Sequence, residues 1–270
     1  MLNFGNDNAR PEIEKTMPTD RNWYGLMIGN SRLHWADFQG DILQKTWETP
    51  HLSLPPGQAA IVIPEPLTKA QADVYLASVV PTQTERWLNR IPSAQRLTLE
   101  QIPLKGCYPT LGIDRALAVL GAGEKYGFPV LVIDGGTALT LTGANGQQTL
   151  IGGAILPGLR LQLQALTRQT AQLPDLTLPQ SLPPRWALET KAAIASGIIY
   201  SVLAGLTGWI QDWQGQLPGS TVIFTGGDGT LLTQLLTQYW AQSYPGSDPI
   251  LCDPHLIFWG MKTVRNHLNS

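Results

Sequence analysis

Residues 130–142 read VLVIDGGTALTLT, and this stretch decides how the rest of the chain can fold. The apolar, β-branched run 130–133 predicts a buried strand, and the two glycines after Asp134 permit a tight turn. From Thr137 onward apolar and polar residues alternate, which predicts a second strand. Such a turn can present backbone N–H groups to an anion, with Asp134 placed to hold a cation beside it. The alternative is an ordinary hairpin whose aspartate caps its own turn.

A second, degenerate copy of this unit lies near the start of the chain. Residues 26–31 read LMIGNS, again an apolar run, a glycine turn and a small hydroxyl residue. Residues 26–49 and 132–155 therefore share one plan at an offset of 106 residues. Two such loops resemble the duplicated ribonuclease-H-like α/β fold of the sugar kinase, actin and Hsp70 superfamily. That resemblance implies two actin-like ATPase domains, expected at 22–112 and 113–270, with ATP in the cleft between them.

The composition argues against several classes of protein. Among 270 residues, 43% are apolar and 14% charged, and the net charge is −2, so no nucleic-acid partner is expected. Cys107 and Cys252 match no metal or redox spacing, which is typical of reduced thiols in the cytoplasm. The four histidines lack ligand spacing and are interpreted as packing or surface residues. Residues 1–21 are polar, which predicts a mobile N-terminal tail rather than a signal peptide.

Residues 192–210 are uncharged over 19 positions and must be weighed as a membrane span. They contain several hydroxyl residues and three glycines, Gly197, Gly205 and Gly208, and no basic cluster flanks them. A helix buried in a core or in a dimer interface is therefore favoured, and no membrane partner is expected. The glycines are candidate points of interruption within a helix expected at 186–213.

Outside the repeat, strands and helices alternate in the first half, as in a mixed or parallel α/β sheet. Further strands are predicted at 59–64, 76–80, 96–99 and 220–225. Further helices are predicted at 82–89, 116–126, 160–172, 230–242 and 255–267, with Thr68 as one more candidate helix cap. A third glycine turn follows at 226–229; it can bring backbone close to a nucleotide base, or be a plain strand–helix connection.

The predicted loop 106–115 enters the helix expected at Ala116. Asp114 is a good N-cap there, and the helix N-terminus with Arg115 is expected to keep its carboxylate ionised. An arginine at a helix N-terminus opposes the macrodipole. Arg115 is therefore expected to have another task, such as gripping a carboxylate or a phosphate.

From about residue 24 to the C-terminus the chain resembles the type III pantothenate kinases, which phosphorylate pantothenate in the first step of coenzyme A biosynthesis. Each motif alone is weak, but their shared order is specific. The motifs are Ile28-Gly29-Asn30-Ser31-Arg32, Tyr108 with Leu111-Gly112-Ile113-Asp114-Arg115, Ile133-Asp134-Gly135-Gly136-Thr137-Ala138, residues 152–159, residues 170–174, Ser196-Gly197 and Thr225-Gly226-Gly227.

The resemblance implies a role for each matching residue. Asp114 would be the general base, Asp134 would hold a monovalent cation (K⁺ or NH₄⁺), and Mg²⁺ would accompany ATP. The chain would form a homodimer. Pantothenate would be contacted by Tyr108, Gly112, Ile113, Asp114, Arg115 and Thr190. ATP would be bound by Met27, Ile28, Gly29, Asn30, Ser31, Arg32, Leu33, His34 and Thr137.

One departure from the family pattern bears on activity. The family begins Asp-x-Gly-Asn-Thr, whereas this chain has Met27 at the aspartate position and Ser31 at the threonine position. Glu189 replaces the asparagine usually found before Thr190. The loss of a carboxylate at position 27 can weaken Mg²⁺ binding or reposition ATP. Two alternatives to a pantothenate kinase therefore stand: a non-catalytic regulator of the same fold, or a related kinase acting on another small alcohol.

Overall fold

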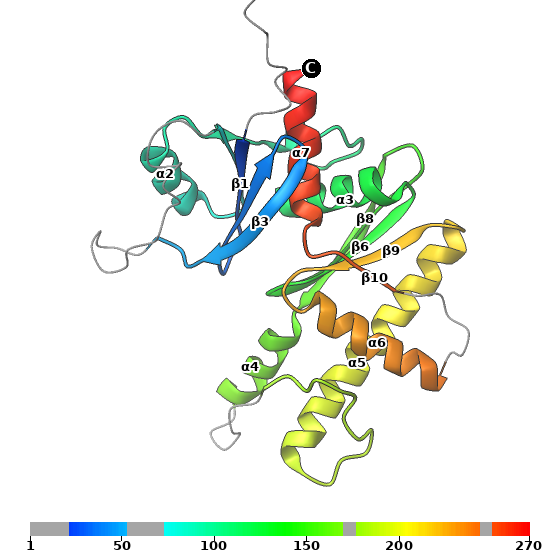
Figure 1. Ribbon diagram of the computed structural model, residues 1–270. Coiled ribbons are helices and arrows are strands. Elements are labelled where there is room, and N and C mark those ends of the chain that lie inside the picture. The colour runs from blue at the N-terminus through cyan, green and yellow to red at the C-terminus, as the bar shows by residue number, and fades with distance from the viewer. Residues whose placement is uncertain (1–21, 53–72, 170–176, 244–249) are drawn as a thin grey trace, which may run out of the picture.

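The computed structural model describes residues 22–52, 73–169, 177–243 and 250–270 (Figure 1). Two five-stranded sheets carry the fold, and helices lie between and beside them. The tail expected at 1–21, the strand expected at 59–64 and the cap expected at Thr68 lie outside the described residues.

The first sheet has the order β3-β2-β1-β4-β5. Its strands are β1 (Asn22–Ile28), β2 (Leu33–Gln39), β3 (Ile42–Thr49), β4 (Asp73–Ser78) and β5 (Gln95–Arg96). The first three strands are antiparallel, whereas β4 pairs in parallel with both β1 and β5. Successive β1 side chains face opposite sides: Met27 joins the inner core, and Leu26 lies in the cluster around Trp87 of α2 (Pro81–Arg90).

The second sheet has the order β10-β9-β6-β7-β8. Its strands are β6 (Val130–Gly135), β7 (Ala138–Ala144), β8 (Leu150–Pro157), β9 (Thr221–Thr225) and β10 (Leu251–Cys252). Within each half, the strands taken in chain order occupy the same places, with the first between the second and the fourth. Both halves also share the pattern of antiparallel and parallel pairs. The duplication predicted from the 106-residue offset is thus confirmed.

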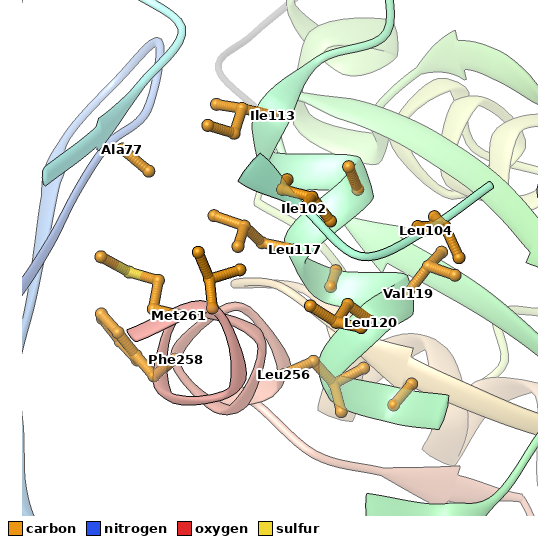
Figure 2. Close-up of a cluster of buried hydrophobic side chains, with 14 of the residues drawn as sticks. Ala77, Ile102, Leu104, Ile113, Leu117, Val119, Leu120, Leu256, Phe258 and Met261 are labelled. Carbon is orange, nitrogen blue, oxygen red and sulfur yellow. The ribbon is translucent and has the colours of Figure 1, made fainter. Parts of the chain in front are cut away.

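Helices α3 (Ile113–Tyr126) and α7 (Leu256–Asn269) pack together between the sheets. Figure 2 shows Leu117 and Leu120 of α3 against the α7 side chains of the shared apolar core. The two helices approach closely at Gly121 and Gly260, where a Cβ on either residue would overlap backbone of the other helix. This core joins both sheets, so the domain boundary expected at 112/113 stays a prediction.

Asp253 anchors α7 to the end of α3. Its buried carboxylate accepts hydrogen bonds from Lys125 Nζ at 2.7 Å, Tyr126 Oη at 2.9 Å and Trp259 Nε1 at 2.9 Å. Burial alone would raise the pKa of Asp253, but the bonds from Lys125, the His255 backbone, Tyr126 and Trp259 hold it below its usual value. The ionised carboxylate of Asp253 therefore links three side chains, two from α3 and one from α7.

Three helices pack in the apolar cluster on the other side of the second sheet. They are α4 (Leu159–Gln169), α5 (Thr190–Gln216) and α6 (Gly229–Ser243). By length and composition α5 is apolar enough to cross a membrane, and 44% of its most apolar window is buried in the protein. The face with Gly197, Gly205 and Gly208 is exposed, and none of these glycines interrupts the helix.

Several predicted boundaries were wrong. The helix expected from 116 begins at Ile113, and the one expected from 186 begins at Thr190. The strand expected at 96–99 is replaced by the short β5 and a 3₁₀ turn, Leu99–Gln101, closed by a capping box between Thr98 and Gln101. Caps and turns of this kind depend on side-chain contacts that apolar periodicity does not reveal.

Candidate active site

The two glycine turns of the repeat meet. Ser31 Oγ and Thr137 Oγ1, equivalent residues of the two copies, lie 2.7 Å apart and share a hydrogen bond. Both residues are exposed, and each follows the glycine turn of its own half. Two hydroxyls and two turns therefore face one point between the halves, which is the arrangement predicted from the repeat.

The third glycine turn closes around Asp134. The N–H of Asp228 donates to the carbonyl of Gly135 at 2.8 Å, and a Cβ at Gly226 would overlap the Asp134 carboxylate. Arg160 donates from Nε at 3.1 Å and from Nη2 at 2.8 Å to the buried Asp228 carboxylate. The ion pair of Arg160 with Asp228 thus stabilises the third glycine turn, which packs against Asp134 and Gly135. The sequence did not single out either residue of this pair.

Asp114 and Asp134 form a pair of interacting carboxylates. Burial, with the negative charge of Asp114 as the second cause, raises the pKa of Asp134 to about 6. Burial also raises the pKa of Asp114, and the N–H and positive charge of Arg115 oppose only part of that rise. The helix start and Arg115 were expected to favour the ionised form of Asp114; both act in that direction, but burial acts against them and has the larger effect on its pKa.

Asp114 is also not the N-cap. Gly112 occupies that position, and Asp114 lies in the first turn of α3, where its Oδ1 accepts the N–H of Arg115 at 2.8 Å. A Cβ at Gly112 would overlap this same Oδ1, so the glycine leaves room for the carboxylate. Ile113 is 8% exposed and its side chain lies in the core, so residues 112 and 113 offer mainly backbone to a ligand.

Arg115 binds groups of the protein itself. It is 9% exposed, and its guanidinium donates to Thr142 Oγ1, the Leu141 carbonyl and Tyr108 Oη. Arg115 was predicted to bind a carboxylate or a phosphate, and none of these three contacts is to such a group. They fix Tyr108, an exposed residue of the predicted substrate loop.

The first glycine turn is held from two sides. The N–H of Gly29 donates to the Arg32 carbonyl at 3.0 Å, and His51 Nε2 lies 2.8 Å from the Gly29 carbonyl. His51, interpreted from sequence as a packing or surface residue, therefore contacts this turn. Glu48 pairs with Arg32 at 3.2 Å and with His34 at 3.2 Å. Burial lowers the pKa of His34, against the opposing charge of Glu48.

Not every predicted site residue joins this cluster. Met27, Ile28 and Leu33 are 2%, 0% and 0% exposed, so their side chains pack in the core and only their backbone can face a nucleotide. Asn30 is exposed in the turn. Thr190 is exposed at the start of α5, and that end of α5 lies far from α3 in Figure 1. Within one chain the start of α5 is therefore apart from α3.

The donor set suits a weakly bound hard cation better than a transition metal. Among the described residues no group of three His, Cys, Asp or Glu side chains could hold a metal ion. Carboxylate and carbonyl oxygens are the ligands that K⁺ and Mg²⁺ prefer, and a cation beside Asp134 would oppose both causes of its raised pKa, burial first and the charge of Asp114 second. The site thus fits a cation shared with the phosphates of a ligand.

The architecture is that of the actin-like ATPase fold: two halves of one topology with facing glycine turns. Two solved structures share this fold. A Campylobacter jejuni protein described as a Baf family transcriptional activator has a TM-score of 0.59 at 22% identity, covering 92% of this chain and 100% of that one. MreB5 of Spiroplasma citri, bound to AMPPNP, has a TM-score of 0.51 at 11% identity, covering 93% and 98%.

Comparison of sequences identifies the family within this class. The profile of type III pantothenate kinase matches residues 26–212. Type III pantothenate kinases from a Nostoc and a Synechocystis strain are each 44% identical to the chain; the alignments cover 91% and 96% of it, and 95% and 97% of the relatives. The chain belongs to the type III pantothenate kinase family. The resemblance stated from its motifs is confirmed.

Proposed function

We propose that the chain transfers the γ-phosphoryl group of ATP to the hydroxyl of pantothenate, giving 4′-phosphopantothenate for coenzyme A biosynthesis. The observation that carries the proposal is the carboxylate pair Asp114–Asp134 beside the Ser31–Thr137 contact. Family membership supports the kinase, and neither the regulator nor a kinase for another alcohol has support from the comparisons.

Each part of the site has a role in this reaction. Backbone N–H groups of residues 30–32 and the hydroxyls of Ser31 and Thr137 bind the phosphates of ATP. Asp114 accepts the proton of the pantothenate hydroxyl as that oxygen attacks phosphorus. Tyr108 and Arg115, with the backbone of residues 112 and 113, hold the acceptor. K⁺ or NH₄⁺ at Asp134, and Mg²⁺ with ATP, would neutralise charge on the transferred group.

An assay of ADP release over a panel of small alcohols tests this function. Release that depends on pantothenate, and not on other alcohols, is the expected result. Release at the same rate without any alcohol would favour the regulator, and release with another alcohol alone would identify the related kinase. The two cyanobacterial relatives serve as positive controls in the same assay.

Met27 provides a test of the Mg²⁺ role. An aspartate at 27, the family residue, would replace a side chain 2% exposed in the apolar core. We expect Met27→Asp to lower stability by at least about 2 kcal/mol, as large-to-small core changes do. We also expect Mg²⁺ with ATP to raise its Tm more than that of wild type, and less Mg²⁺ to suffice for activity. Met27→Leu is the matched control; an equal Mg²⁺ response in all three proteins would mean the turn is rebuilt around Met27.

The chain also acts, in this proposal, as a cytoplasmic homodimer with the exposed face of α5 against a second copy. No atom of the described residues lies within 4 Å of a Cβ built on Gly197, Gly205 or Gly208, and small residues permit close helix packing. Trp209 on the same helix is 47% exposed. The separation between α3 and the start of α5, where Thr190 lies, is what a site shared by two subunits would require. Light scattering should give a dimer, and Gly205→Arg a monomer; a monomeric wild type would exclude this interface.

A further inference from the structure

Arg115 is a buried cation whose hydrogen bonds run in two directions. On one side Nε donates to Thr142 Oγ1 at 2.9 Å and Nη2 donates to the Leu141 carbonyl at 3.2 Å, both on β7. On the other side Nη1 donates to Tyr108 Oη at 3.0 Å. A planar guanidinium presents its donors in a fixed fork, so the direction of Nε sets the direction of the others.

We propose that Thr142 is a positioning residue for the acceptor alcohol, acting through Arg115 on Tyr108. The inference rests on the function proposed above, in which Tyr108 and Arg115 hold the substrate. Thr142 is 2% exposed, so it cannot itself reach a ligand in the cleft, whereas Tyr108 is 40% exposed. Through Arg115, the Thr142 hydroxyl on β7 thereby fixes Tyr108, which lies in the loop that precedes α3.

The geometry makes Thr142 more than a filler of space. Among the described residues, Thr142 and Tyr108 are the two side chains that Arg115 bonds through its guanidinium. If the Thr142 hydroxyl were removed, the Leu141 carbonyl would be the one acceptor left on β7, and the guanidinium plane could rotate about that hydrogen bond. The neighbouring strand also makes room, because a Cβ at Gly153 would overlap the Leu141 carbonyl and crowd Nη2. The same guanidinium lies beside Asp114 and opposes the rise of its pKa.

Thr142→Val removes the acceptor while keeping the shape and the β-branched side chain that a strand favours. We expect kcat/KM for pantothenate to fall about ten- to a hundredfold, the equilibrium worth of a hydrogen bond to a charged group, mainly through KM. The KM for ATP should stay as in wild type. Thr142→Ser returns the hydroxyl and should restore most of the lost efficiency.

The matched control is Thr221→Val, the same change in the same sheet on β9, which β6 separates from β7; Thr221 pairs with Val130 and has no bond to Arg115 among the contacts described above. It should leave both KM values unchanged. The proposal is overturned if Thr142→Val keeps the wild-type KM for pantothenate, if it raises both KM values alike, or if Thr142→Ser behaves as the valine variant does.

Hydrogen exchange supplies a readout that does not depend on turnover. Thr142→Val should speed amide exchange in residues 106–112 and leave the interior of α3 and β6 protected; Thr142→Ser should not. If the wild type fails to phosphorylate pantothenate yet this local change is seen, the proposed substrate is wrong and the positioning stands. Unchanged exchange in residues 106–112 would refute the positioning, whatever the substrate.

Discussion

Replacing Asp114 by asparagine is expected to lower kcat by about 10²–10⁴-fold, the usual contribution of a general base. The substrate hydroxyl must lose its proton as the phosphoryl group arrives, and an amide cannot accept it. ATP binding should change little, because the proposed role of Asp114 is toward the acceptor and not toward ATP. Steady-state kinetics with both substrates varied measures the two effects separately.

The fold should survive this substitution. The N-cap of α3 is Gly112 and not Asp114, so an asparagine at position 114 does not remove the helix cap. Because burial raises the pKa of Asp114, the wild-type kcat should rise with pH through a midpoint above that of an ordinary aspartate, and this limb should vanish in the variant. A variant with near wild-type kcat and an unchanged Tm would remove Asp114 from the chemistry. A variant that unfolds would make it a structural residue.

Replacing Asp134 by alanine is the second large change. We expect kcat to fall about 10²–10³-fold, the cost of removing one group that stabilises charge in the transition state. We also expect sensitivity to the monovalent cation to be lost. In wild type, exchange of K⁺ for a bulky organic cation should weaken ATP binding, since Asp134 and the phosphates would then repel each other.

The cation-dependent activity should change with pH in a defined direction. The pKa of Asp134 is about 6, so the carboxylate is protonated below that pH and cation-dependent activity should appear as pH rises through it. A bound cation favours the ionised form, so raising K⁺ should move the midpoint to lower pH. Asp37→Ala is a control, since Asp37 is another partly buried strand carboxylate with a raised pKa, in the first sheet. A wild type indifferent to K⁺ at every pH would refute the assignment.

The local plan of the site could be predicted from the sequence because strands and glycine turns repeat over few residues. Alternation in residues 138–142 predicted a strand, and β7 occupies it in register with β6. The 106-residue offset placed Ser31 and Thr137 at equivalent positions, and these are the two hydroxyls that touch. Both results follow from patterns that a single chain displays within a short window.

The energetic setting of the site could not be predicted in the same way. Two of the three partners of the Arg115 guanidinium lie on β7, and His51, beyond β3, contacts Gly29. Such contacts form only when the strands are assembled, so no spacing in the sequence signals them. The rise in the pKa of Asp114 could not be predicted for the same reason: the helix start and the neighbouring charge are local, whereas desolvation depends on everything packed around the carboxylate.

The packing of α7 has a consequence for how the protein is made. Its side chains Phe258, Met261 and Val264 share one core with Trp23 and Phe38 of the first sheet. During synthesis the N-terminal strands emerge first, but the helix that covers their apolar inner face follows the whole of the second sheet in the chain. The first half therefore lacks this cover until α7 has been synthesised. Until then, that face is open to aggregation or to a chaperone.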